Sequence, residues 1–305
     1  MRAFLTGGQG FVGPWLCRHL AAQGDDVVLA DPLLDVTDGP AVHHAIKAAR
    51  PEVVYHLAAQ SSVSSSWEDP AATFSVNVLG SLHVLDAVHA CAPGARVVLV
   101  SSVEIYGPVQ PDDLPVTEVS PFRPATPYAA SKAAAEMAAL QAHIGRGLDV
   151  VRARPFTHTG PGQTPRFFVP SMARQIVEAS RTGATELRTG NLQVARDILD
   201  VRDVVRAYRL LAERGAPGEA YNICSGRSVT LAEVVRLLLA LAGSDLKVVT
   251  DPARVRPVDL PDLRGDPSRL HDATGWEPEF ALEETLADVL AYWRAQDSET
   301  EAAAS

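Results

Sequence analysis

Short apolar runs alternate with longer stretches of helical spacing along the first half of the chain. The apolar runs are nearly continuous, which is typical of strands buried on both faces. The stretches between them carry apolar residues three and four positions apart, which predicts amphipathic helices. This alternation indicates βαβ units and therefore an α/β fold with a Rossmann-type, doubly wound parallel sheet. The predicted strands are Met1–Leu5, Asp26–Asp31, Val53–Leu57, Arg96–Val100 and Leu148–Ala153, and the predicted helices are Val12–Gln23, Pro40–Ala49, Pro70–Cys91 and Pro127–His143.

The alternation of strands and helices stops in the second half of the chain, where proline-rich loops separate predicted helices. We expect residues 1–155 to form a dinucleotide-binding Rossmann domain, completed by a returning strand and helix near 196–213. Residues 156–297 would form a smaller, mixed α/β, substrate-binding part, and the polar residues 298–305 a flexible tail. The helices predicted in this half are Val169–Thr182, Val201–Glu213, Leu231–Ala242 and Leu282–Arg294.

A glycine-rich turn lies between the first predicted strand and the first predicted helix. In this context Gly7 permits a tight turn, and Gly10 lets backbone N–H groups approach a pyrophosphate. Gly13 allows the helix to pack closely on the strand, so that the helix N-terminus faces the phosphates. An ordinary glycine turn is the alternative interpretation. The residues predicted to hold a dinucleotide here are Gly7, Gly10, Phe11, Val12 and Gly13.

An acidic residue, Asp31, follows the glycines by about 20 positions, at the end of the second predicted strand. An acid at this point accepts hydrogen bonds from the adenosine ribose hydroxyls and repels a 2′-phosphate. We therefore expect NAD(H) or NADP(H) as the cofactor, with NAD(H) favoured. Asp35 and Val36 are predicted to contact the adenine, whereas Asp38 has a simple alternative as the N-cap of the next helix.

The pattern Tyr128-Ala-Ala-Ser-Lys132 places a phenol and an ammonium four residues apart on one face of a predicted helix. The ammonium would lower the pKa of the phenol from its reference value of about 10 toward working pH, as acid–base catalysis requires. Ser102 follows the fourth predicted strand and would hold the oxygen of a reacting carbonyl or alcohol. We predict that Ser102, Tyr128 and Lys132 are catalytic.

Composition narrows the class of partner. The 305 residues suffice for one large or two modest domains. A formal net charge of −10 argues against nucleic acid, so an anionic substrate would be held by local arginines. No apolar run approaches the roughly 20 residues that a bilayer requires, and no signal peptide is recognisable. We therefore expect no membrane association.

The cysteines and histidines do not indicate a metal centre. Cys17, Cys91 and Cys224 are far apart and lie in apolar surroundings, as in a reduced, cytoplasmic protein. The nine histidines show no ligand spacing, and the adjacent His43 and His44 lie on a predicted surface helix. We therefore expect no metal site.

The predicted helix that begins at Tyr128 is rich in alanine. Small side chains along one face permit close approach of a second helix. With the predicted helix Pro70–Cys91, it would form a four-helix contact across a two-fold axis, and the protein would be a homodimer. The alternative is that the alanines pack only against the protein's own sheet.

The order of these motifs resembles the extended short-chain dehydrogenase/reductases that act on nucleotide sugars. The resemblance covers nearly the whole chain, and it is most specific in the run His-Thr-Gly-Pro-Gly-Gln163. In that run the chain is similar to the GDP-4-dehydro-6-deoxy-D-mannose reductases, which make GDP-D-rhamnose. The segments that carry the resemblance are the glycine loop, Leu57–Ala59, Asn77, Leu82–Val88, Ser102, Tyr128–Lys132, Arg154–Gln163, Gly190–Asp203, Arg256–Asp259 and Gly265–Arg269.

The resemblance implies that NAD(P)H reduces the C4 ketone of a GDP-linked 4-keto-6-deoxyhexose. It implies Ser102, Tyr128 and Lys132 as the catalytic triad, with Glu104 beside them and Asn77 supporting them near the sheet. Arg196 and Arg256 would hold the diphosphate, for which guanidinium forks are suited. The further cofactor residues that it implies are Leu57, Ala58, Ala59, Asn77, Tyr128, Lys132 and Pro155. The substrate residues that it implies are Ser102, Val103, Glu104, Tyr128, Thr157, Arg196, Arg256 and Asp259.

Two positions depart from the family pattern: Thr157 replaces an asparagine, and Asp259 replaces a glutamate. Three other functions stay open. A sugar-nucleotide 4,6-dehydratase would need a polar acid where this chain has Val103, so the sequence favours reduction. A 4-epimerase would use the same triad with a tightly held NAD⁺. A non-enzymatic binding protein on this fold is disfavoured by the intact Ser–Tyr–Lys set.

Overall fold

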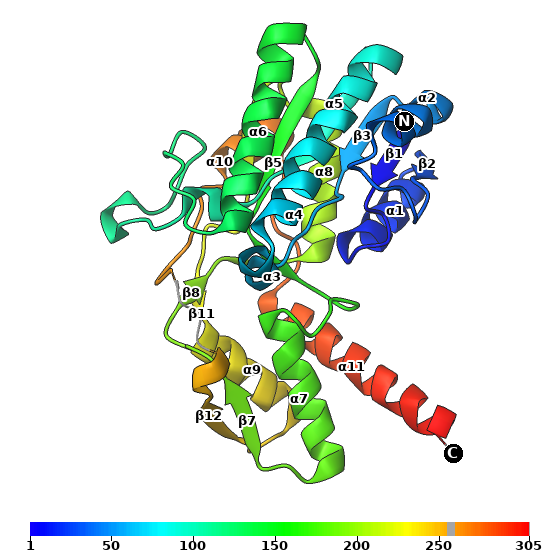
Figure 1. Ribbon diagram of the computed structural model, residues 1–305. Coiled ribbons are helices and arrows are strands. Elements are labelled where there is room, and N and C mark those ends of the chain that lie inside the picture. Colours follow the sequence, from blue (N-terminus) through cyan, green and yellow to red (C-terminus); the bar gives the residue numbers. More distant parts are fainter. Residues whose placement is uncertain (255–259, 305) are drawn as a thin grey trace.

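A six-stranded parallel sheet forms the centre of the amino-terminal part (Figure 1). The computed structural model describes residues 1–254 and 260–304. The strand order is β10-β5-β4-β3-β1-β2, with β1 at the point where the order reverses. The strands are β1 (Arg2–Thr6), β2 (Asp26–Leu29), β3 (Val53–His56), β4 (Arg96–Val100), β5 (Val150–Pro155) and β10 (Ala220–Ile223). The predicted α/β, doubly wound fold is confirmed.

Helices cover both faces of the sheet, as the side chains of β1 show. One face carries α1 (Val12–Ala22), α8 (Val201–Arg214) and α10 (Ser268–Thr274); the other carries α2 (Gly39–Ala49), α5 (Gly80–Cys91) and α6 (Pro127–Arg146). Ala3 and Leu5 pack with α1 and α8, whereas Phe4 packs with α2, α5 and α6. Successive side chains of a strand point to opposite faces, so both faces are apolar, as the continuous apolar runs predicted.

The predicted helix Pro70–Cys91 consists of three elements in succession. A π-helical turn, η1 (Ser75–Leu79), joins α4 (Pro70–Phe74) to α5. Within the described residues, this stretch is the one long and apolar enough to cross a membrane, which the sequence reading had not singled out. A core helix passes the same test, and α5 packs against α2 and α6. Its apolar character is therefore explained by the core.

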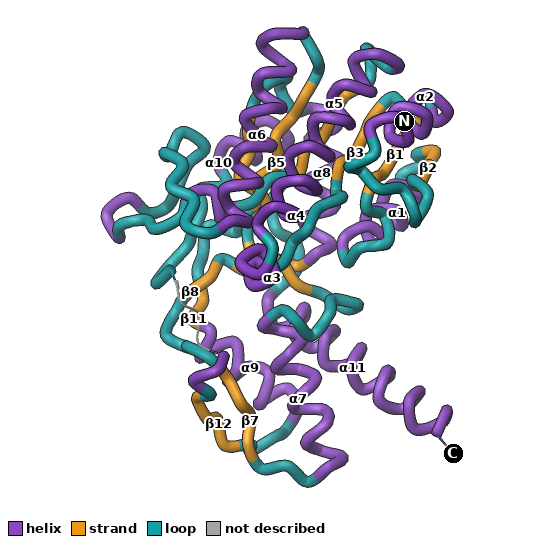
Figure 2. The backbone as a smooth tube through the Cα atoms, viewed as in Figure 1, coloured by secondary structure: helices purple, strands orange, loops and turns teal. Residues whose placement is uncertain are grey.

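The second part of the chain has its own small core and mixed secondary structure. Its apolar cluster contains Leu187, Leu238 and Leu286. The segments that run between the two parts are mostly loops and short strands (Figure 2). The helices here are α7 (Phe168–Thr182), α9 (Leu231–Ala242) and α11 (Leu282–Ala304). The strands pair as β6 (Thr157–Thr159) with β9 (Ile198–Asp200), β7 (Glu186–Thr189) with β12 (Lys247–Thr250), and β8 (Ala195–Arg196) with β11 (Val229–Thr230).

The strand that returns to the main sheet differs from the one expected. Helix α8 does return, but β8 and β9, near residue 196, pair outside the main sheet. The strand that joins β5 is β10. The buried Asn222 interrupts the apolar run of β10, which explains why the pattern did not reveal it.

The last helix is longer than expected. It continues past Arg294, where the predicted helix ended, to Ala304 and so includes most of the stretch 298–305 that was expected to be a flexible tail. This stretch is rich in glutamate and alanine, which favour the helix strongly.

Gly107 offers a stability test of the loop behind the candidate site. It ends the 3-10 helix η2 (Val103–Tyr106) with a φ of 62°, and a Cβ there would overlap the carbonyl oxygen of Arg123. We expect Gly107→Ala to lower the free energy of unfolding by at least about 3 kcal/mol. The matched control is Gly147→Ala, where φ is 71° but the space around the Cβ is open, and we expect a loss of about 1 kcal/mol. Urea unfolding measures both, and equal losses would contradict the argument.

Candidate active site

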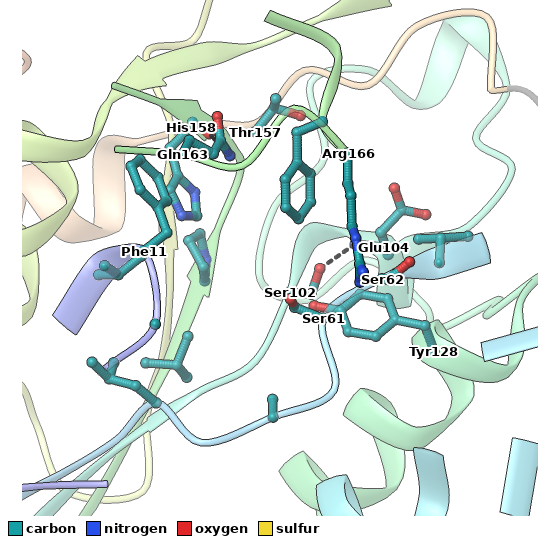
Figure 3. A pocket seen from close by; sticks show the side chains of 18 of the residues that line it. Phe11, Ser61, Ser62, Ser102, Glu104, Tyr128, Thr157, His158, Gln163 and Arg166 are labelled. Atoms are coloured by element: carbon teal, nitrogen blue, oxygen red, sulfur yellow. Dashed lines mark hydrogen bonds between the residues drawn. The ribbon is translucent and has the colours of Figure 1, made fainter. Parts of the chain in front are cut away.

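A cavity of about 1260 Å³ lies at the carboxyl ends of the sheet strands. Its lining includes the loops that follow β1 to β4 and, from the second part, the start of α7 (Figure 3). Ligands of open α/β sheets bind at this edge, outside the strand ends. A site for one small molecule usually occupies roughly 300–1,000 Å³, so this cavity has room for two ligands together.

The glycine loop is tight at the places where the motif requires it. Gly7 has a φ of 69°, and a Cβ there would lie 2.5 Å from the backbone nitrogen of Ala58. A Cβ at Gly13 would overlap the carbonyl oxygen of Gly8. The Gly10 N–H donates to the Gly7 carbonyl over 3.0 Å and closes the turn. Side chains are excluded here, so a ligand can approach the backbone closely.

The start of α1 fits an anion. Val12 is its first residue, and the preceding Phe11 supplies no side-chain cap. The first turn also contains no acidic side chain. Its N–H groups and the positive end of the helix dipole are therefore suited to phosphate oxygens. The predicted residues Gly7, Gly10, Phe11, Val12 and Gly13 all line the cavity.

The predicted adenosine residues also line the cavity. Asp31 accepts the Leu33 N–H over 2.8 Å, which folds the loop after β2. Asp35 lies farther along, and the backbone N–H of Thr37 lowers the pKa of its carboxyl. Asp38 instead caps α2 by accepting the Ala41 N–H over 3.0 Å, which settles its open interpretation as an N-cap. Val36, Leu57, Ala58 and Ala59 complete this part of the lining.

Ser102 and Tyr128 lie together in the structure although 26 positions separate them in sequence. Ser102 lies just beyond β4, and its Oγ accepts the Glu104 N–H over 3.2 Å. Tyr128 lies in the first turn of α6, which a proline and the capping hydroxyl of Thr126 begin. The Tyr128 hydroxyl and Ser102 are hydrogen-bonded, and both face the cavity.

The electrostatics of Tyr128 differ from the expectation. Burial raises the pKa of Tyr128 to about 12; the hydrogen bond with Ser102 lowers it, and the charge of Glu104 raises it. Lys132, which was expected to lower this pKa, donates instead to the carbonyl oxygen of Val100. Burial also lowers the pKa of Lys132 itself to about 8. The phenol therefore stays protonated at neutral pH, which is the state of a proton donor.

Several residues predicted to contact substrate line the same cavity. Val103 and Glu104 lie on η2, and Thr157 begins β6. Pro155, which was predicted to contact the cofactor, ends β5 and lines the cavity as well. Arg196 lies on β8 and donates to the carbonyl of Leu260 over 2.7 Å, so its guanidinium is held in place. The predicted Arg256 and Asp259 lie outside the described residues.

Asn77 does not line the cavity. It lies buried in η1, where its Nδ2 donates to Ser131 Oγ over 2.8 Å and its Oδ1 accepts the Gln60 N–H over 2.8 Å. Asn77 thus ties α6 to the loop after β3. The structure places it behind the site, although it was predicted among the cofactor residues.

Other lining residues were not singled out in the sequence. Arg166 precedes α7 and points into the cavity near Ser62 and Glu104 (Figure 3). Trp67, on α3 (Val63–Glu68), lines the cavity while 53% of its surface is exposed. In the sequence, Arg166 could have been noticed as an arginine in a proline-rich loop, and Trp67 as a tryptophan in a serine-rich stretch. Further lining residues without a predicted role include Ser61, His158, Gln163, Asn191 and Arg254.

His158 lay in the most specific matching run, without an assigned role. Its ring stacks on Phe11 with 6.2 Å between centroids and 12° between planes. Burial lowers the pKa of His158, so its imidazole is neutral at pH 7. The contact joins the glycine loop to the chain segment that follows β5.

Among residues 1–254 and 260–304, no group of three or more His, Cys, Asp or Glu side chains is arranged to hold an ion. Cys17, Cys91 and Cys224 are free thiols there.

The sheet, the glycine loop and the Ser–Tyr–Lys set define an α/β protein of the extended short-chain dehydrogenase/reductase class. The family profile described as GDP-mannose 4,6 dehydratase matches residues 32–289. The chain belongs to this family.

Individual relatives are similar over nearly the whole chain. The GDP-6-deoxy-D-mannose reductase of Pseudomonas aeruginosa is 38% identical over 97% of this chain and 98% of its own. The UDP-glucose 4-epimerase of Mycolicibacterium smegmatis is 30% identical over 96% and 99%. A solved structure of RMD from Pseudomonas aeruginosa complexed with NADPH superposes with a TM-score of 0.90, at 37% identity over 97% of this chain and 100% of that one.

Proposed function

We propose that the protein reduces the C4 ketone of a nucleotide-linked 4-keto-6-deoxyhexose with NAD(P)H, converting GDP-4-dehydro-6-deoxy-D-mannose to GDP-D-rhamnose. The observation that carries the proposal is the hydroxyl of Tyr128, hydrogen-bonded to Ser102 at the wall of a cavity with room for two ligands. The 38% identity to a GDP-6-deoxy-D-mannose reductase supports the substrate class.

Each residue then has a defined task. Ser102 Oγ holds the ketone oxygen, and Tyr128 delivers a proton to it as negative charge develops there. The bound dinucleotide supplies a hydride. The negative charge of Glu104 raises the pKa of Tyr128 and so favours the protonated phenol. Lys132 would hold the nicotinamide ribose.

The substrate diphosphate would be held from the second part. Arg196 lines the cavity and is fixed by backbone carbonyls, so its position is prepared before a ligand arrives. Its planar guanidinium suits phosphate oxygens. Arg256 and Asp259 would contribute further contacts, and Thr157 would contact the sugar where the family usually has asparagine.

Dehydration is an alternative to reduction, because the family profile that matches the chain is described as a dehydratase. A 4,6-dehydratase must remove a proton from C5 and expel the C6 hydroxyl, which needs a polar acid next to the catalytic serine. Val103 lines the cavity at that position and has no proton to give. The epimerase alternative keeps its support from the 30% identity to a UDP-glucose 4-epimerase.

One assay separates these functions. The purified protein is incubated with GDP-mannose, and separately with GDP-4-keto-6-deoxymannose plus NADH or NADPH, while absorbance and products are followed. We expect the dinucleotide to be oxidised only when the keto sugar is the substrate. Conversion of GDP-mannose to a keto product would show dehydration, and interconversion of C4 epimers without net oxidation would show epimerisation.

The variant Tyr128→Phe tests the proton donor in the same assay. We expect turnover to fall by about two to four decades, because proton transfer is lost. The matched control is Tyr55→Phe, which removes a buried hydroxyl that has no hydrogen-bond partner in the described structure. We expect it to retain most of the turnover. Near wild-type activity of Tyr128→Phe would remove this residue from the mechanism.

We propose a preference for NADH over NADPH. The lining segments 6–13 and 30–36 contain the acids Asp31 and Asp35 and no basic side chain that would bind a 2′-phosphate. We expect Asp31→Ser to improve kcat/KM for NADPH roughly tenfold, because a repelling charge is removed. Asp112→Ser, on η3 (Pro111–Asp113) and outside the lining, is the matched control. A tenfold preference of the wild type for NADPH would refute the proposal.

We also propose a homodimer in the cytoplasm, formed through the helices Pro70–Cys91 and α6. These helices pack side by side (Figure 1). They leave large apolar side chains exposed. The exposed side chains are Phe74, Leu79, Met137 and Ile144. We expect sedimentation velocity to show a dimer that the double change Leu79→Glu, Met137→Glu dissociates. Val119→Glu, at an apolar residue 80% exposed outside these helices, should leave the dimer intact. A wild-type monomer would contradict the proposal.

A further inference from the structure

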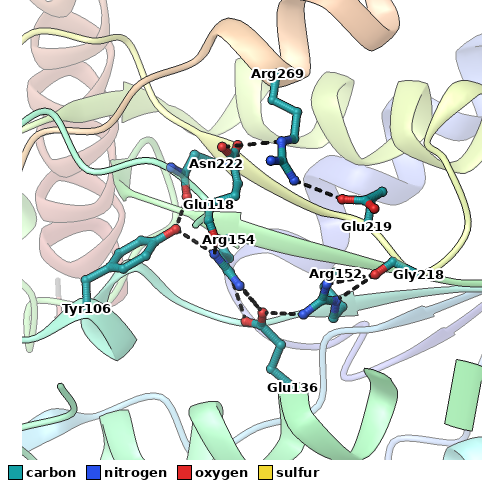
Figure 4. A network of polar contacts seen from close by, with 9 residues as sticks. All are labelled: Tyr106, Glu118, Glu136, Arg152, Arg154, Gly218, Glu219, Asn222 and Arg269. Atoms are coloured by element: carbon teal, nitrogen blue, oxygen red, sulfur yellow. Dashed lines mark hydrogen bonds and ion pairs between the residues drawn. The ribbon is translucent and has the colours of Figure 1, made fainter. Parts of the chain in front are cut away.

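A buried carboxylate lies one helical turn beyond Lys132. Glu136 is fully buried on α6 and is held by two arginines of β5 (Figure 4). Arg152 Nη1 lies 3.2 Å from Glu136 Oε1, and Arg154 Nε lies 2.9 Å from the same oxygen. A carboxylate buried in this way needs paired cations and hydrogen bonds, and both are present.

Arg154, which holds this carboxylate, is itself held in place by further hydrogen bonds. Arg154 Nη1 donates to the hydroxyl of Tyr106 over 2.7 Å and to the carbonyl of Glu118 over 2.8 Å. Tyr106 in turn donates to Asn222 Oδ1 over 2.7 Å. These bonds come from η2, from the loop at residue 118 and from β10, so Arg154 cannot swing away. Glu136 therefore presents its charge at a fixed place under the catalytic helix.

Lys132 has few other charges around it. It is 7% exposed, and its ammonium donates to the Val100 carbonyl of β4. The charge of Lys132 acts on His56 of β3, but His56 is neutral because burial lowers its pKa to about 3. Tyr128 on α6 is neutral as well, since its pKa is raised to about 12. Of the titratable groups facing Lys132, Glu136 supplies the negative charge.

The two influences on Lys132 have opposite signs. Burial, the larger, lowers the pKa of Lys132 to about 8, and the charge of Glu136 raises it. A lysine whose pKa has been lowered this far is charged at pH 7 only by a narrow margin. Removal of the carboxylate would reduce that margin.

We propose that Glu136 is a positioning residue for the reaction: its clamped carboxylate keeps Lys132 in the ammonium form at working pH. The proposal rests on the proposed function for the use of that ammonium, which is to hold the nicotinamide ribose. The charge relation itself is a property of the free protein and can be measured without substrate.

The composition of the chain makes the measurement direct. Of the 27 lysines and arginines, only three are lysines: Lys47, Lys132 and Lys247. Lys47 and Lys247 are exposed, so they provide two internal reference signals. Protein labelled with ¹³C at lysine Cε therefore gives three signals in an NMR titration, and the signal missing from Lys132→Arg is that of Lys132.

We expect the wild-type Lys132 signal to titrate near pH 8, and Glu136→Gln to move its midpoint downward by about half a pH unit or more. The matched control is Glu118→Gln. It removes a carboxylate that bonds the Asn222 N–H in the same network but lies off α6, and we expect it to leave the midpoint within about 0.2 units. An unchanged midpoint in Glu136→Gln, or an equal shift in Glu118→Gln, would overturn the proposal.

Glu136→Gln leaves two buried arginines without their carboxylate, so a second variant covers a failure to fold. Arg152→Gln removes a positive charge and leaves Arg154 to hold Glu136. We expect the Lys132 midpoint to rise in this variant, and an unchanged or lower midpoint would count against the proposal. A wild-type midpoint below pH 7 would overturn it without any variant.

Kinetics then separate this proposal from the proposed function. The alkaline limb of kcat/KM for the keto sugar should follow the Lys132 midpoint, and in Glu136→Gln both should move to lower pH. A merely structural role would lower kcat without moving the limb. If the NMR midpoint moves as expected and no keto sugar is reduced, the reductase function fails while the charge relation stands. If the keto sugar is reduced but the alkaline limb of kcat/KM does not follow the titration midpoint of Lys132, the positioning role of Glu136 is refuted.

Discussion

The site depends on how helix α6 is seated against the sheet. This one helix carries Tyr128, Lys132 and Glu136, one on each successive turn. Small residues on its inner face, among them Ala129 and Ala139, are buried and permit a close approach. Asn77 below and Arg154 beside the helix hold it through hydrogen bonds and an ion pair. A shift of α6 would therefore displace the phenol, the ammonium and the buried carboxylate together.

Desolvation is the largest electrostatic influence on both Tyr128 and Lys132. Burial raises the pKa of the Tyr128 phenol, so the proton to be delivered is present at neutral pH. Burial also lowers the pKa of the Lys132 ammonium, which makes its charge depend on the surroundings. A nearby charge is strong in such a place because little water screens it. The carboxylates Glu104 and Glu136 thus raise the pKa values of Tyr128 and Lys132, respectively.

The sequence was sufficient for the parts of the site that depend on local geometry. The glycine loop between strand and helix needs only residues that permit a tight turn, and Gly7 and Gly13 are where the structure excludes a Cβ. Helical spacing placed Tyr128 and Lys132 on one face. It could not give the sign of the change in the Tyr128 pKa, because that depends on burial by distant segments. The same limit explains why Arg166 and Trp67 were missed: Arg166 reaches the cavity from the second part and Trp67 from α3, and which segments line a cavity is decided by the tertiary arrangement.

By itself, the sequence determined the α/β class, the parallel strands, the glycine loop and the pairing of Tyr128 with Lys132 on one helix face, because each follows from periodicity or from short-range spacing. Only the tertiary structure decided that β10 closes the sheet and that Asn77 lies behind the site. It also brought Glu136 between Arg152 and Arg154. The physical reason is that pairing between distant strands and the energy of a buried charge depend on which segments meet in space, and the local order of residues does not specify this.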